Sequence, residues 1–274
     1  MNWKSLFTAG KSITADQARQ YMADKKVSAF SLLDVRQPSE YEKEHLPAAL
    51  LIPLRELPAR LMELDKDKPV IVYCAVGGRS KAAAQFLAGK GFVEVYNLIG
   101  GINAWHGRKA TGQYEKGLEL LCGGMKFADG LQLAFAMEDG LERFYRLLAE
   151  KTSGKEQEGL FQRLAGFEAR HKALLASEYG TVSVSNRAIP CFSGEQAGKN
   201  LMEGGVHAFE VLAQLETKVD ILELAMMFET QALDLYGRLG RKAKTEAIRN
   251  FFLGLADEEL KHLSYLTDEL EGAL

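Results

Sequence analysis

The chain has 274 residues, with 34 Lys and Arg against 37 Asp and Glu, so its formal net charge is −3. Proteins that bind nucleic acid or an acidic membrane surface through charge carry a basic excess, and this composition has none. We therefore expect neither partner. The length is generous for one domain and suits two, each with its own hydrophobic core.

The cysteines and the apolar runs bear on the compartment. Cys74, Cys122 and Cys191 are odd in number and far apart, which does not suit a disulfide framework. The first residues, MNWKSLFTAGKS, lack the sustained apolar stretch of a signal peptide. The longest apolar runs, such as PVIVYCAV, fall far short of a membrane span. We therefore expect a reducing, cytoplasmic location. Cys122 and Cys191 are expected to be inert thiols, and the alternative is that they receive sulfur from Cys74 or resolve an oxidised state.

Residues 14–106 switch repeatedly between strand-like and helix-like patterns. Short runs rich in branched residues predict strands at 31–35, 50–52, 70–74 and 95–98. Amphipathic stretches predict helices at 14–23, 54–64 and 80–90, the first opened by the capping-box spacing of Thr14 and Gln17. Strands that alternate with helices favour an α/β domain whose mostly parallel sheet is covered on both faces.

The segment VIVYCAVGGRSKAAAQFL runs from a buried strand through a glycine-bearing loop into a helix. Cys74 stands at the carboxyl end of the strand, where open α/β sheets place their ligand sites. Loop amides and the helix N-terminus lower the pKa of such a thiol, and they can hold a persulfide or a thiosulfate anion. Arg79 adds a charged fork suited to an oxyanion. We predict Cys74 and Arg79 as catalytic residues, and the loop residues that bind the sulfur donor as Ala75, Val76, Gly77, Gly78 and Ser80.

These residues resemble the rhodanese family, whose active loop has the form C-x-x-G-x-R-S. The resemblance extends to LLDVRQPSEYEKEHLPAA and to NLIGGINAW, in the order expected of the family. Glu44 and Ala48 stand where the family usually has glycines. The resemblance implies sulfur transfer from thiosulfate or another sulfane-sulfur donor. We expect a structural role for Asp34, Arg36 and His45. An inactive module with a buried cysteine is the alternative.

From about residue 125 the strand signal vanishes. Long amphipathic helices are predicted at 129–151, 157–179, 218–240 and 244–271, with one long connection in the middle. Four helices with one crossover favour a ferritin-like bundle. A glycine-bearing stretch precedes them, so the predicted organisation is an α/β domain at 1–108, a linker at 109–126 and an all-α domain at 127–274.

The helical region contains an internal repeat. Each of three acidic or histidine positions in the first helix pair recurs 91 residues later in the second pair, giving Glu138 and Glu229, Glu168 and Glu259, His171 and His262. Residues three apart share a helix face, so each Glu and His of the E-x-x-H pattern can chelate one metal. The other two glutamates can bridge the ions.

Burying four carboxylates and two imidazoles requires cations, which predicts two metal ions. Iron is expected first, and the ligand set leaves manganese and zinc open. Tyr145 and Tyr236 lie two turns from Glu138 and Glu229 and are candidates to support the ligands. The glutamates without a matching partner are expected to face solvent; they are Glu142, Glu158, Glu223 and Glu258.

The helical region resembles the rubrerythrin branch of the ferritin-like superfamily over almost all of residues 129–271, with AMEDGLERFY and ADEELKHLSYL as typical phrases. Ala232 stands where rubrerythrins often place an extra carboxylate, and no C-x-x-C pair is present. The resemblance implies reduction of peroxide or oxygen with an unidentified electron donor, and ferritin-like bundles commonly pair into dimers. The alternatives are a non-catalytic iron or sulfur carrier or sensor, and a scaffold with a structural metal.

Overall fold

The structure, a computed structural model, describes residues 11–23, 25–111, 130–151, 154–179, 217–243 and 245–273. Cys122, Cys191 and residues 112–126 of the predicted linker lie outside these ranges. The chain divides into two compact units, one made of residues 1–114 with 226–264 and the other of residues 115–225 with 265–274. The domain limits at residues 108 and 127 stay a prediction.

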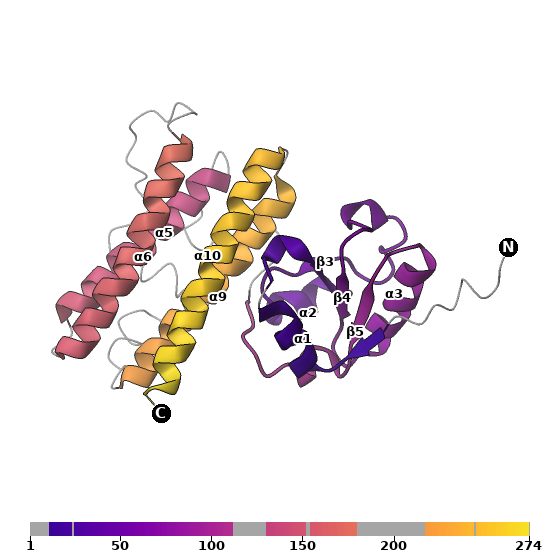
Figure 1. The fold of residues 1–274 in the computed structure, drawn as a ribbon, viewed down its shortest axis with the longest axis horizontal. Coiled ribbons are helices and arrows are strands. Elements are labelled where there is room, and N and C mark those ends of the chain that lie inside the picture. Colours follow the sequence, from indigo (N-terminus) through magenta and orange to yellow (C-terminus); the bar gives the residue numbers. More distant parts are fainter. Residues whose placement is uncertain are drawn as a thin grey trace. The chain divides into compact units, whose positions relative to one another are not determined.

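A five-stranded sheet forms the centre of the N-terminal region (Figure 1). All its strand pairs are parallel, and the strand order is β1-β5-β4-β2-β3. The parallel α/β sheet predicted from the sequence is therefore present, and each of the four predicted strands is observed. The strands are β1 (Lys11–Ile13), β2 (Ser31–Asp34), β3 (Leu50–Leu51), β4 (Val70–Tyr73) and β5 (Val95–Leu98).

Helices cover both faces of this sheet, as Figure 1 shows. On β4, Val70 and Val72 join a core with residues of α3, whereas Ile71 and Tyr73 join a core with residues of α1 and α2. This alternation is the period of two that a strand imposes on its side chains. Both faces are apolar, so β4 reads as a continuous buried run. The helices are α1 (Ala15–Ala23), α2 (Pro38–Lys43) and α3 (Gly78–Gly89).

The helices of this region differ from the predicted ones in two places. The predicted helix at 54–64 is wrong: the segment forms turns and a short 3-10 helix, η3 (Leu61–Glu63). Pro58 lies inside it, and proline lacks the N–H that a helix interior needs. Helix α2 was not predicted; it begins after Gln37, with Pro38 at its first position. The two other 3-10 helices are η2 (Val27–Ala29) and η4 (Gly101–Ala104).

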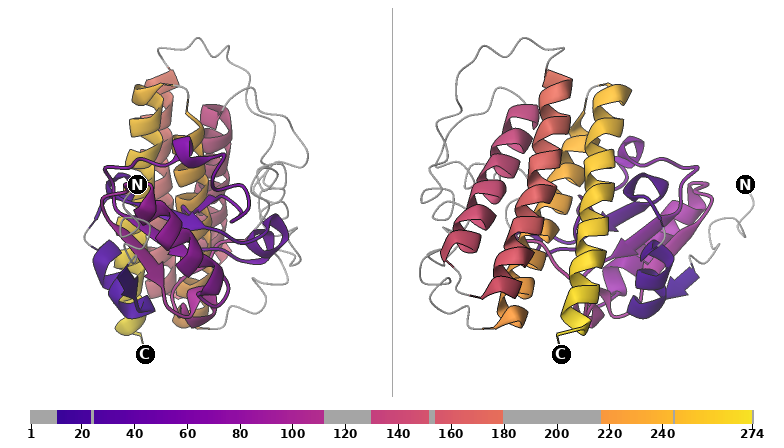
Figure 2. Two further views of the ribbon diagram at one scale, coloured as in Figure 1. Left: turned by 90° about the vertical axis from the view of Figure 1, so that its right-hand side faces the viewer. Right: turned by 60° about the vertical axis from the view of Figure 1, so that its left-hand side comes forward.

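The C-terminal region is helical, with bounds close to the predicted ones. Helices α5 (Gly130–Lys151) and α6 (Lys155–Tyr179) run side by side (Figure 2). Helices α9 (Lys218–Lys242) and α10 (Glu246–Glu271) also contact each other, because Tyr236 of α9 stacks on Phe252 of α10 with ring centroids 6.4 Å apart. Within the parts of the chain that the structure describes, no helix combines the length and apolar character needed to cross a membrane.

The turn after α2 contacts α9 through a buried carboxylate in the first unit. Asp234 accepts a hydrogen bond from the Ala48 backbone N–H at 3.0 Å, and its other oxygen lies 3.2 Å from Nε2 of His45. Arg238 lies 2.8 Å from the same carboxylate. Gly237 allows this approach, because a Cβ at that position would lie 2.6 Å from the Ala48 side chain. Burial raises the pKa of Asp234, but Arg238 and His45 outweigh it and hold the pKa below the usual range.

We expect Asp234→Asn to lower the free energy of unfolding by about 3 kcal/mol at pH 7, because it removes the charge that faces the buried Arg238 guanidinium. A depressed carboxyl pKa stabilises the fold above the unfolded-state value, and this stabilisation is lost in acid. The difference from the unsubstituted protein should therefore shrink as the pH falls below about 4 in urea titrations. Asp16→Asn, in an exposed pair with Arg19, should change stability by less than about 1 kcal/mol. Equal effects of the two substitutions would contradict the assignment.

Candidate functional site

The Cys74 loop joins β4 to α3 and gathers the predicted catalytic and donor-binding residues. Cys74 is almost fully buried at the carboxyl end of β4, and the backbone N–H of Gly77 donates to its Sγ at 3.1 Å. The Ser80 hydroxyl lies 3.4 Å from the same sulfur. Of the intervening residues, the Val76 side chain is exposed at the tip of the loop. The predicted residues thus lie in one continuous segment, from the end of β4 into the first turn of α3.

The surroundings of the Cys74 thiol favour its ionised form. Burial raises its pKa, but hydrogen bonds from the Ser80 hydroxyl and from the amides of Ser80, Gly77 and Val76 outweigh burial, so the net pKa is lowered. A thiolate is the reactive form of cysteine, and hydrogen bonds to a charged group are stronger than neutral ones. This loop thus favours a nucleophilic sulfur.

Two glycines hold the loop in this shape. Gly77 has φ +99°, in the left-handed region that other residues avoid, and this turn aims its N–H at the sulfur. Gly101 lies against the other side of the loop, where a Cβ would come within 2.1 Å of the Cys74 carbonyl oxygen. The next amide, of Ile102, donates to that carbonyl at 2.8 Å. Gly101 was not predicted as a site residue, although the G-G pair of NLIGGINAW was a signal.

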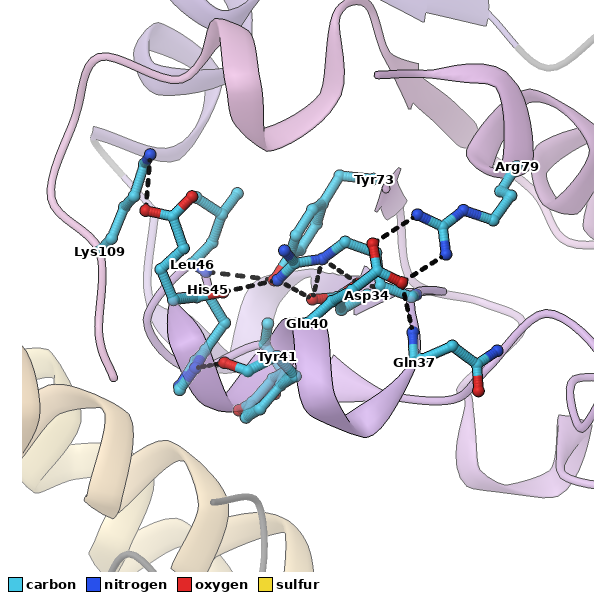
Figure 3. A network of polar contacts seen from close by, with 12 residues as sticks. Asp34, Gln37, Glu40, Tyr41, His45, Leu46, Tyr73, Arg79 and Lys109 are labelled. Atoms are coloured by element: carbon cyan, nitrogen blue, oxygen red, sulfur yellow. Dashed lines mark hydrogen bonds and ion pairs between the residues drawn. The ribbon is translucent and has the colours of Figure 1, made fainter. Parts of the chain in front are cut away.

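Arg79 is held by a partner that the sequence analysis did not identify. Both of its terminal nitrogens donate to Glu40 of α2, each at 2.7 Å (Figure 3). The hydrogen bond from Arg79 lowers the pKa of Glu40 to about 2, so this carboxylate is ionised at neutral pH. Arg79 thus faces the donor loop as one half of a bidentate ion pair.

A buried ion pair joins the end of β2 to the turn that follows α2. Asp34 at the end of β2 accepts hydrogen bonds from Arg36 at 2.7–3.0 Å, and Arg36 also donates to the Glu44 carbonyl at 2.7 Å. His45 stacks on Tyr41 with ring centroids 3.6 Å apart. These contacts match the structural roles predicted for Asp34, Arg36 and His45. Figure 3 shows Asp34, Tyr41 and His45 of this group.

In the helical region, the predicted metal ligands of α5 and α6 form a buried group. Glu138 and Glu168 are fully buried, and His171 is nearly so. Nδ1 of His171 lies 3.4 Å from a Glu138 oxygen and 3.8 Å from a Glu168 oxygen. One ligand atom from each of the three residues lies within 4.8 Å of the others, so the three could hold one metal ion.

The same arrangement recurs on α9 and α10. Nδ1 of His262 lies 3.3 Å from a Glu229 oxygen and 3.2 Å from a Glu259 oxygen, and both carboxylates are fully buried. Burial and the neighbouring Glu259 raise the pKa of Glu229 well above its usual value. Burial lowers the pKa of His262, but the two carboxylates outweigh it and raise the pKa to about 9. Carboxylates crowded in this way fit a cation.

Other predictions for the helical region have mixed outcomes. The prediction that Glu142 faces solvent is wrong: its exposed fraction is 8%, and Lys172 lies 3.1 Å from its carboxylate. Lys172 comes from α6, so spacing within α5 could not reveal this pair. Glu223 is exposed, as predicted, and Glu158 and Glu258 are partly exposed. Tyr145 and Tyr236 are both buried.

Comparison with known proteins bears on the N-terminal domain. The family model of the rhodanese-like domain matches residues 14–108. Thiosulfate sulfurtransferase GlpE of Coxiella burnetii is 41% identical over 85 residues, which cover 31% of this chain and 79% of that protein. The Bacillus subtilis protein YqhL is 47% identical over 77 residues, which cover 28% of this chain and 61% of YqhL. A crystal structure of a rhodanese-like domain protein from Staphylococcus aureus is 32% identical, with a TM-score of 0.33, and the match covers 35% of this chain and 90% of that one.

A parallel α/β domain that cradles a thiol in backbone amides at the end of a strand defines a cysteine-based group-transfer domain. With the identity to GlpE, it shows that the chain belongs to the rhodanese family through residues 14–108. Sulfur transfer is thereby supported at the level of this domain. The family match ends at residue 108, and the ferritin-like and rubrerythrin resemblance of the helical region stays a prediction.

We expect Ser80→Ala to slow alkylation of Cys74 by iodoacetamide about tenfold at neutral pH, because the thiolate loses a hydrogen bond. The measurement is the rate of Cys74 modification against pH, followed on the Cys74 peptide by mass spectrometry. Ser39→Ala, on the exposed side of α2, should leave the profile unchanged. An unaltered profile in Ser80→Ala would show that the hydroxyl does not support the thiolate.

Proposed function

We propose that the N-terminal domain transfers sulfane sulfur through a persulfide on Cys74. The observation that carries this proposal is the Cys74 sulfur, which receives the Gly77 amide and lies beside the Ser80 hydroxyl with a lowered pKa. The name of GlpE, a thiosulfate sulfurtransferase, supports the same chemistry. The loop amides that favour a thiolate also favour the anionic persulfide that replaces it.

The transfer balances as two substitutions at sulfur. The Cys74 thiolate attacks the outer sulfur of a donor such as thiosulfate, a new S–S bond forms, and sulfite leaves with the electron pair of the broken bond. An acceptor nucleophile such as cyanide then attacks the outer sulfur of the Cys74 persulfide. Thiocyanate forms, and the Cys74 thiolate is restored. No external oxidant or reductant is needed.

Cys74→Ser should reduce cyanide-dependent thiosulfate cleavage by about a hundredfold or more, because a serine hydroxyl stays protonated where the thiol ionises. The measurement is thiocyanate formation by the full chain. Metal content should be unchanged in the same variant, since Cys74 belongs to the α/β domain. Full activity in Cys74→Ser would overturn the proposal for this site.

In the helical region, the proposal is a ferritin-like four-helix bundle with two divalent metal ions, iron first and manganese or zinc as alternatives. Two matching groups support it, each with a histidine between two buried carboxylates. Oxygen and imidazole donors suit all three metals. The residues that would hold the ions are Glu138, Glu168, His171, Glu229, Glu259 and His262.

Bound iron would supply the reduction of peroxide or oxygen, with electrons from an external donor. The chain's own part is to hold the carboxylates and to exclude water. Tyr145 and Tyr236 are buried on the same helices as Glu138 and Glu229 and would support these ligands. That two copies of the chain associate as a dimer stays a prediction.

A non-catalytic carrier or sensor of iron is the second candidate. It is favoured by Ala232, a buried apolar residue three positions after Glu229, where the resembling family often has another carboxylate. Repeated turnover of peroxide with a defined reductant separates an enzyme from a storage protein, which oxidises its iron once. A structural metal would be neither exchanged nor reduced.

Glu138→Gln should lower the bound metal from about two ions per chain to one or none, because it removes a charged ligand. The matched control is Glu142→Gln, one helical turn away and paired with Lys172, which should keep both ions. Metal analysis by mass spectrometry and the melting temperature with and without chelator are the measurements. Loading should strengthen as the pH rises toward 9, since a metal must displace the proton of His262. If Glu142→Gln lost metal and Glu138→Gln did not, the ligand on α5 would be Glu142, one helical turn from the predicted position.

A further inference from the structure

The guanidinium group of Arg79, beside the Cys74 loop, is already paired with a carboxylate of the same chain. Arg79 is the one charged side chain in the sequence CAVGGRS, and Glu40 engages both of its terminal nitrogens at 2.7 Å (Figure 3). Two parallel hydrogen bonds of this kind satisfy the geometry that a sulfonate or another oxyanion would use. An oxyanion that binds Arg79 must therefore displace Glu40 or lie beside its negative charge.

Glu40 is fixed in this position by its helix. It stands at the third position of α2, and its carboxylate also accepts the Gln37 backbone N–H at 3.1 Å. The next residue, Tyr41, is fully buried, and its hydroxyl donates to the Ala49 carbonyl at 3.2 Å. The capping box and the buried tyrosine hold the helix, so Glu40 is a preorganised partner of Arg79.

The pair changes the charge that a donor meets. Arg79 alone would attract the dianion thiosulfate to the Cys74 thiol, but Glu40 cancels this attraction and adds repulsion at short range. The persulfide of an uncharged thiol, R–S–SH, has no oxyanion and does not need the fork. Its outer sulfur is attacked by the Cys74 thiolate, the S–S bond of the donor breaks, and R–S⁻ leaves with the electron pair while the proton stays on the transferred sulfur.

We infer that Glu40 is a specificity-determining residue, which disfavours dianionic oxyanion donors and directs the Cys74 site toward thiol persulfides. This inference rests on the proposed sulfur transfer through Cys74 and names its donor class. Thiosulfate remains a donor of lower efficiency, and Glu40 sets the ratio between the two.

Glu40→Gln is the sharpest test, because glutamine at this helix position can still accept the Gln37 N–H and complete the capping box. The substitution removes the charge and leaves α2 intact. The single-turnover rate of Cys74 persulfide formation would be followed by the mass of the Cys74 peptide. The two donors are thiosulfate and the persulfide of 2-mercaptoethanol, which has no charged group apart from its own sulfur.

The expected result is a rise of about tenfold in the thiosulfate rate of Glu40→Gln, with the mercaptoethanol persulfide rate within about twofold of the unsubstituted protein. The thiosulfate gain should diminish at high salt. Glu40→Asp, which keeps the charge, should retain the original donor ratio.

Glu44→Gln is the matched control. Glu44 ends the same helix, and its carboxylate pairs with Lys109 at 3.0 Å, so the variant changes net charge equally without touching Arg79. Its donor ratio should be unchanged. An equal rise with both donors, a fall with thiosulfate, or the same shift in Glu44→Gln would overturn the inference. Absence of a persulfide on Cys74 with either donor would instead overturn the sulfur-transfer proposal on which it rests.

Discussion

The N-terminal domain depends on the close approach of Gly101 to the backbone of the Cys74 loop. The Cys74 and Ala75 carbonyls accept the amides of Ile102 and Asn103 at 2.8 and 3.1 Å, and a side chain at position 101 would occupy the same space. With the carbonyls turned toward η4, the loop amides are left to face the sulfur. The electrostatics of the thiol therefore follow from a packing constraint on one glycine.

In the helical region the main constraint is electrostatic, because burying charged groups costs free energy. In each helix pair a histidine lies between two carboxylates, and in the α9–α10 pair Glu229 has a raised carboxyl pKa beside His262 with a raised imidazole pKa. A divalent cation would offset these buried carboxylates more strongly than a proton does. The matched geometry of the two pairs gives the 91-residue repeat a physical reason.

The local patterns of the sequence were sufficient for the sheet, the long helices and the Cys74 loop. Strand alternation, helix periodicity and the Thr14–Gln17 capping box act over a few residues, and both hydrogen bonds of that box are present at 2.9 and 3.2 Å. The pairing of Glu40 with Arg79 joins residues 39 apart, and no short-range pattern could predict it. The error at Glu142 has the same origin, because its partner Lys172 lies on another helix.

The departure from the usual rhodanese turn at Ala48 also has a structural reason. Ala48 stands where the family usually has glycine and adopts φ +59°, a conformation that costs a residue with a side chain about 1 kcal/mol. Its N–H donates to the buried Asp234, whose carboxylate also faces His45 and Arg238. A hydrogen bond to a charged group contributes about 1.5–3 kcal/mol, which exceeds the strain. The alanine is therefore tolerated because Asp234 of α9 supplies the hydrogen-bond acceptor. Asp234 lies five positions after the proposed ligand Glu229, so α9 carries both a proposed metal ligand and the residue that holds the turn after the helix of Glu40.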